Sequence, residues 1–113
     1  MKLEVNKEKI AIAVSKAERV TGKNSSLPVL SCVVLEAKGN SLFVSATNLD
    51  IGIELEVPAK VQEQGVLAVS GGVLSSYLTS LNKNENVLSL HDQNDNLYIS
   101  SKNSETVINT VSH

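Results

Sequence analysis

The residue types that most often perform catalysis are scarce in this chain. Cys32 is the only cysteine, and the two histidines are His91 and the last residue, His113. A catalytic nucleophile needs a base within hydrogen-bond reach, and the sequence offers no such pair. Cys32 lies in an apolar run, where an inert buried thiol is the expected form. We therefore predict that the protein is not an enzyme.

Two further segments resemble binding motifs without completing them. Residues 92–96 begin like a calcium loop, but its required glycine is Leu97 and its bidentate glutamate is Asn103, so a turn between strands is the better interpretation. Gly71 and Gly72 resemble a phosphate-cradling turn but lack the third glycine or the lysine of the known motifs, which favours a tight strand-to-helix turn. We expect no metal site and no cofactor.

The strongest chemical signal is a group of basic residues on one predicted helix. Apolar residues recur at helical spacing over residues 10–20, and at about 100° per residue they form one stripe. Lys9, Lys16, Arg19 and Lys23 fall within an arc of about 80° on the opposite side. This helix therefore presents a basic face away from the core.

Charge is also distributed unevenly along the chain. The whole sequence has a formal net charge of −2, which by itself does not indicate a nucleic-acid-binding protein. Residues 6–23, however, hold five basic and two acidic residues, whereas residues 24–113 hold four basic and nine acidic ones. A basic face on an acidic body suits a polyanion, with an ordinary solvated helix as an equal alternative. Ile12 interrupts the face and no aromatic residue accompanies it, so we expect contacts to phosphates rather than bases.

The elements that position these residues follow a repeated order. The Asn6 cap starts one helix, which ends at Gly22, and the Ser70 cap starts a second, which ends before residues 82–86. Strand patterns cover residues 1–5, 29–37, 42–46 and 51–57 in the first half, and 66–69, 87–91, 96–101 and 105–111 in the second. We expect the 29–37 strand to be buried on both faces, and Ile51, Ile53, Leu55 and Val57 to face inward.

This β-α-β-β-β order, present twice, predicts an α+β fold with antiparallel sheets and both helices on one face. The length of 113 residues fits a single domain spanning residues 1–113. One cysteine excludes an internal disulfide, and the N-terminus lacks the apolar run of a signal peptide, so we predict a cytoplasmic protein. No stretch reaches the roughly 18 apolar residues of a membrane helix.

The order of motifs resembles the N-terminal domain of the bacterial DNA polymerase III beta subunit, the replicative sliding clamp. The resemblance rests on Met1-Lys2-Leu3-x-Val5, Leu27-Pro28-Val29-Leu30, Thr47-Asn48-Leu49-Asp50, Gly65…Val69-Ser70 and Ser101…Thr110, in that order. It extends over essentially all 113 residues. The resemblance implies the DNA-clamp fold, with three such domains in a subunit and two subunits in a ring. The ring encircles duplex DNA and tethers the replicative polymerase, as a processivity factor without catalysis.

The resemblance also assigns residues to sites. Helices line the hole of the clamp, which places Lys9, Lys16, Arg19, Lys23 and Asn24 at the DNA backbone. Asn24 stands where the family often has an arginine, and Gly72 and Val73 stand where basic residues usually begin the second helix.

The second helix and the last strand form the subunit interface in the family, which assigns Val73, Tyr77, Thr106 and Ile108 to the closure of the homodimer ring. An edge strand suits such a contact. Polymerase and clamp loader would bind through later domains. The alternative is a free-standing interaction module of this fold that uses an edge strand, and a reading frame that ends at His113 would favour it.

Overall fold

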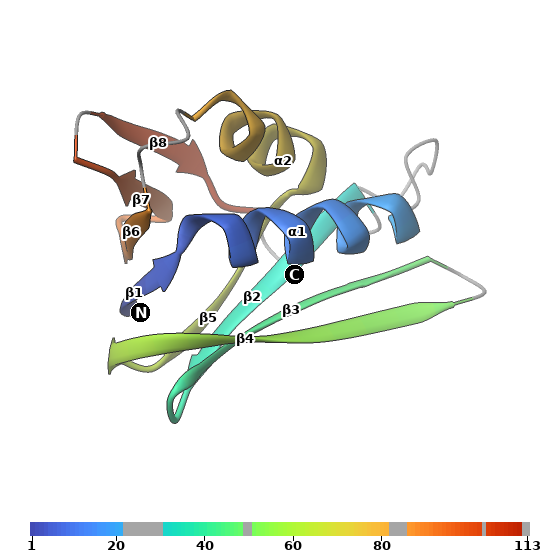
Figure 1. Cartoon of the computed structure of the whole chain (residues 1–113). Helices are drawn as coiled ribbons and strands as arrows, with labels where there is room; N and C mark the ends of the chain where they lie inside the picture. Colours follow the sequence, from blue (N-terminus) through green and yellow to red (C-terminus); the bar gives the residue numbers. More distant parts are fainter. Residues whose placement is uncertain (22–30, 49–50, 82–85, 103, 112–113) are drawn as a thin grey trace.

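The computed structural model describes residues 1–21, 31–48, 51–81, 86–102 and 104–111 (Figure 1). Its elements are, in chain order, β1 (Lys2–Asn6), α1 (Lys7–Val20), β2 (Cys32–Lys38), β3 (Ser41–Thr47), β4 (Gly52–Glu63), β5 (Gly65–Ser70), α2 (Gly71–Ser80), β6 (Val87–Gln93), β7 (Asn96–Ser100) and β8 (Glu105–Asn109). A strand, a helix and three strands therefore occur twice in succession. The predicted duplication and the α+β class are confirmed.

The eight strands form one antiparallel sheet in the order β5-β2-β3-β4-β1-β6-β7-β8. The long strand β4 joins its two halves, because residues 52–58 pair with β3 and residues 59–63 pair with β1. Pro58, which cannot donate a ladder hydrogen bond, stands where the strand changes neighbour. Beyond β8, the Val111 N–H donates to the Ala68 carbonyl oxygen at 2.8 Å, which brings this end of the chain beside β5.

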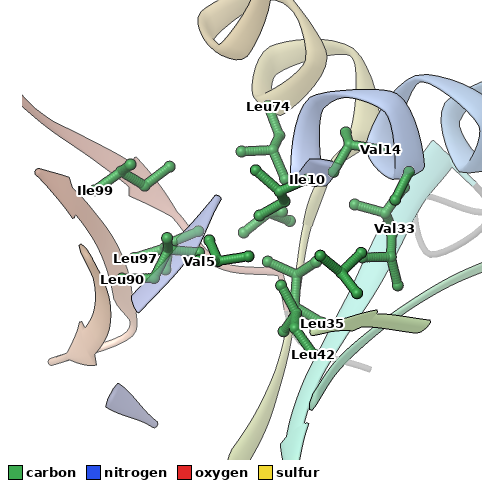
Figure 2. Close-up of a cluster of buried hydrophobic side chains, with 14 of the residues drawn as sticks. Val5, Ile10, Val14, Val33, Leu35, Leu42, Leu74, Leu90, Leu97 and Ile99 are labelled. Carbon is green, nitrogen blue, oxygen red and sulfur yellow. The ribbon is translucent and has the colours of Figure 1, made fainter. Parts of the chain in front are cut away.

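Both helices cover the same side of the sheet, as predicted. Helix α1 packs on β2, β3 and β4, α2 packs on β2 and β5, and the two helices contact each other (Figure 1). Figure 2 shows Ile10 and Val14 of α1 and Leu74 of α2 pointing toward strand residues such as Leu35. The core is aliphatic, and the same buried cluster continues to Leu97 under the second half of the sheet.

Two predictions about strand faces are wrong. In β2, Val33 and Leu35 are buried but Val34 is only half-buried, because the helices cover one face of the sheet and leave the other open. Ile51 lies outside β4 and is 57% exposed, so it does not face inward. The helices do not fully cover this end of β4, where the neighbouring inward position, Ile53, is only half-buried.

The first residue is part of the packed structure. The Met1 side chain is buried, and its ammonium group lies 2.6 Å from the Asp92 Oδ1 atom. A side chain at Gly65 would place its Cβ 2.9 Å from the Met1 Cβ, so this close approach requires glycine. Within the described ranges, no helix is long and apolar enough to cross a membrane.

Candidate nucleic-acid interface

Helix α1 is held at both ends by side-chain hydrogen bonds. At its start, the Asn6 side chain accepts a hydrogen bond from the Lys9 backbone N–H at 3.0 Å, which confirms the predicted cap. At its end, the Thr21 hydroxyl donates to the Glu18 carbonyl oxygen at 2.7 Å. Arg19 lies in the last turn, where a positive charge interacts favourably with the helix dipole.

Asn48, from a distant part of the chain, also hydrogen-bonds the end of this helix. Its Nδ2 group donates to the Val20 carbonyl oxygen at 3.0 Å, and its Oδ1 atom accepts from the Ile51 N–H at 2.9 Å. The Val20 carbonyl would otherwise lack a partner within the helix. Asn48 therefore has a structural role, which the sequence pattern does not display because the contact joins residues 28 positions apart.

The basic side chains of α1 lie on its solvent-facing side. Lys9, Lys16 and Arg19 are exposed, whereas the apolar stripe of the helix is buried. None of the three makes an ion pair with another residue that the structure describes. Their charges are therefore uncompensated at short range and available to an anionic partner.

Ile12 divides this basic face into two grooves. Lys16, Arg19 and Ile12 line a groove of about 540 Å³ between α1 and α2. Lys9 and Ile12 line a smaller groove of about 190 Å³ between α1 and β4, which Leu55 and Glu56 also border. The basic residues predicted to form one arc therefore lie in two groups, with Lys9 on one side of Ile12 and Lys16 and Arg19 on the other. Lys23 and Asn24 lie outside the described residues.

Helix α2 contributes hydroxyl groups to this side of the molecule but no charge. Its exposed residues include Ser76, Thr79 and Ser80, and none of its ten residues is basic. The Thr79 hydroxyl donates to the Ser76 carbonyl oxygen at 3.0 Å, and the Ser80 hydroxyl donates to the Tyr77 carbonyl oxygen at 2.6 Å. Because these donors are used within the helix, the basic residues of α1 dominate the electrostatics of the face.

The residues assigned to a subunit interface have unequal exposure. Val73 is 53% exposed in the first turn of α2, where the Ser70 cap accepts its N–H at 3.3 Å. Tyr77 is half-buried, and its buried hydroxyl has no hydrogen-bond partner among the described residues. Val73 therefore offers exposed apolar surface, whereas Tyr77 is packed mainly against the core.

Strand β8 places Ile108 in the core of this domain. Thr106 and Ile108 lie opposite Ile99 and Leu97 of β7 and face inward, and Ile108 is only 7% exposed within the core. The alternation of the strand puts Val107 outward instead, and its side chain is 50% exposed. Val107 therefore exposes more side-chain surface than Ile108 in this domain, and the assignment of Ile108 to a subunit interface stays a prediction. Over residues 105–109, β7 is the only strand that pairs with β8 in the described part of the chain.

Neither catalysis nor a metal site gains support from the geometry. Cys32 is buried, and burial raises the pKa of its thiol, which favours the unreactive protonated form. The His91 ring stacks on the Tyr98 ring, with 4.9 Å between their centroids, on the face of the sheet away from the helices. Among the described residues, no three His, Cys, Asp or Glu side chains are grouped closely enough to hold a metal ion.

A sequence profile described as the DNA polymerase III beta subunit, N-terminal domain, matches residues 1–113. The chain belongs to this family of sliding clamps. The beta sliding clamp of Streptomyces coelicolor is 30% identical over 81 residues, which cover 72% of this chain and 22% of that protein. The beta sliding clamp of Buchnera aphidicola is 28% identical over 113 residues, which cover 98% of this chain and 30% of that protein.

The fold agrees with this family. Caulobacter crescentus pol III beta superimposes with a TM-score of 0.92 at 25% identity, over 99% of this chain and 30% of that chain. The resemblance and the clamp fold inferred from the sequence are confirmed. The chain spans less than one third of the length of these clamps. The alternative of a free-standing interaction module is not favoured, because these relatives are sliding clamps.

Proposed function

We propose that this domain is the first of three in a subunit of a ring-shaped clamp that encircles duplex DNA and tethers the replicative polymerase. The observation that carries this proposal is the exposed, uncompensated basic face of α1 in a member of the sliding-clamp family. Lys9, Lys16 and Arg19 would face the phosphates across the hole of the ring, and we assign Lys23 and Asn24 to the same DNA contact from the likeness to the family. The role is topological, so the domain needs no catalytic group and no cofactor.

The contacts to DNA would be few and independent of base sequence. The three described cations lie on a face without aromatic side chains, so base stacking has no platform there. Lysine and arginine commonly contact phosphate oxygens, and such contacts carry no sequence information. Weak contacts of this kind hold the ring on the duplex while still permitting it to slide.

Closure of the ring would use α2 and β8 of this domain against another subunit. Val73 and Val107 supply exposed apolar side chains, and β8 supplies an edge for strand addition. Tyr77, Thr106 and Ile108 would take part with less exposed area, because Tyr77 and Thr106 are half-buried and Ile108 is buried in this domain. Polymerase and clamp loader would bind later domains of the protein, and the whole complex would act in the cytoplasm, where the bacterial chromosome lies.

The test is retention of the full gene product on DNA of different topology. A clamp loaded on a nicked circular plasmid should stay bound during gel filtration at moderate salt and should be lost when the plasmid is linearised. Equal retention on circular and linear DNA would contradict encirclement. Equal loss from both would contradict encirclement as well.

A further inference from the structure

The groove between the two helices combines apolar side chains with a basic border. Helices α1 and α2 pack against each other (Figure 1) and leave an open groove of about 540 Å³ on their solvent side. Ile12 from α1, and Leu78 and Leu81 from α2, line it. The cations on its border are the exposed Lys16 and Arg19 and the half-buried Lys7. Glu8 is the only acidic residue that borders it within the described part of the chain.

Contact with DNA explains the cations of this groove but not its apolar side chains. Ile12 is 51% exposed in the middle of the basic face, and an isoleucine gains nothing from a phosphate group. A single exposed apolar residue is ordinary. This one, however, shares a groove with the half-buried Leu81, so apolar surface from two helices is available to the same ligand.

We propose that this groove binds an acidic amphipathic helix of another protein. The apolar side of that helix would cover Ile12 and Leu81, and its carboxylates would pair with Lys16 and Arg19. An amphipathic helix in a groove between helices is a recurrent mode of recognition, and the charge of the border selects an acidic partner. A second copy of this chain presenting the same face is disfavoured, because its cations would meet these cations.

The proposed helix and duplex DNA would compete for part of the same surface. Lys16 and Arg19 would bind the phosphates of DNA and the carboxylates of the helix alike. This competition rests on the proposed function of the α1 face. Ile12 would serve the helix alone. A partner that occupies the groove would therefore weaken DNA binding by the clamp. Substitution of Ile12 should weaken binding of the helix without weakening binding of DNA.

The test uses a synthetic 16-residue peptide of glutamate, alanine and leucine in which the leucines form one helical face. Fluorescence anisotropy with the 113-residue chain at 50 mM salt should show saturable binding. A peptide of the same composition with scattered leucines, and one with lysine in place of glutamate, should bind far more weakly. Unlabelled duplex DNA should displace the bound peptide.

Variants of the chain assign the site. Ile12→Ser should weaken binding of the peptide about five- to tenfold, since half of an isoleucine side chain remains to be buried, and should leave binding of duplex DNA within twofold. Lys16→Ala combined with Arg19→Ala should weaken both. Val66→Ser, at an exposed valine of β5 outside the groove, should change neither, and circular dichroism should confirm that each variant is folded.

Equal binding of the amphipathic and scattered-leucine peptides would overturn the proposal, because it would show attraction by charge alone. Unchanged peptide affinity in Ile12→Ser would overturn it as well. If the wild-type chain does not bind duplex DNA but binds the peptide, and Ile12→Ser weakens that binding, the DNA role of α1 is refuted and the peptide site in the groove is supported. If the chain binds duplex DNA through Lys16 and Arg19 but does not bind the peptide, the proposed peptide site is refuted and the DNA role of α1 is supported.

Discussion

Replacing Lys9, Lys16 and Arg19 together by alanine should remove most of the salt dependence of duplex binding. Each phosphate that a cation neutralises contributes a slope of about −0.9 to the dependence of log affinity on log salt concentration, so three contacts predict about −2.7. Raising the salt from 50 to 200 mM should therefore weaken the wild-type chain about 40-fold. The exposure of all three side chains, and their lack of ion pairs with described residues, justify counting each one fully.

The assay is anisotropy of a fluorescein-labelled 20-base-pair duplex, titrated with the chain at several salt concentrations. Each single alanine variant should reduce the slope by about 0.9. The matched control replaces Lys2, Lys38 and Lys102, which are exposed and lie on strands or turns away from α1, and changes the net charge equally. If this control reduces the slope as much as the α1 variant, the attraction is diffuse and the assignment of the basic face is refuted.

Three further predictions concern the elements that support the site. Gly71→Ala should destabilise the fold in urea denaturation, because the added Cβ would lie 3.2 Å from the Val33 Cγ1 atom. Gly72→Ala, with nothing within 4 Å of its Cβ, should instead stabilise the fold by about 0.5 kcal/mol. Unchanged or increased stability of Gly71→Ala would contradict the tight packing at Gly71. Asn48→Ala should cost about 1 kcal/mol by leaving the Val20 carbonyl without this partner, while Asn109→Ala on an exposed strand position should cost little; equal melting temperatures would refute this role of Asn48. Because burial raises the pKa of the Cys32 thiol, its reaction with a maleimide at pH 8 should be much slower in the folded chain than in urea, and rapid labelling of the folded chain would contradict its burial.

Local features were predictable where neighbouring residues decide them. The caps at Asn6 and Ser70 were predicted because a capping side chain bonds a backbone N–H three residues further on. The exposure of Lys9, Lys16 and Arg19 followed from helical periodicity, since the buried stripe of one helix determines its opposite face. The duplicated order of elements likewise followed from periodicity and turn residues alone.

Site features that depend on other elements were not predictable in this way. The division of the basic face by Ile12 depends on where α2 and β4 lie relative to α1. The inward position of Ile108 depends on its pairing with Leu97 of β7, and a strand pattern by itself does not say which alternate face is covered. Ile51 is exposed because the helical layer does not extend over that end of β4.

The sequence by itself determined the class of the fold, its internal repeat, its family and the charge of one helix face. Tertiary structure decided which apolar residues stay exposed, how β4 joins the two halves of the sheet, and which residues far apart in the sequence form hydrogen bonds and ion pairs. Periodicity and capping act over a few residues, so the sequence displays them directly. The Asn48–Val20 hydrogen bond and the Met1–Asp92 ion pair join residues 28 and 91 positions apart, and only the folded chain brings such groups together.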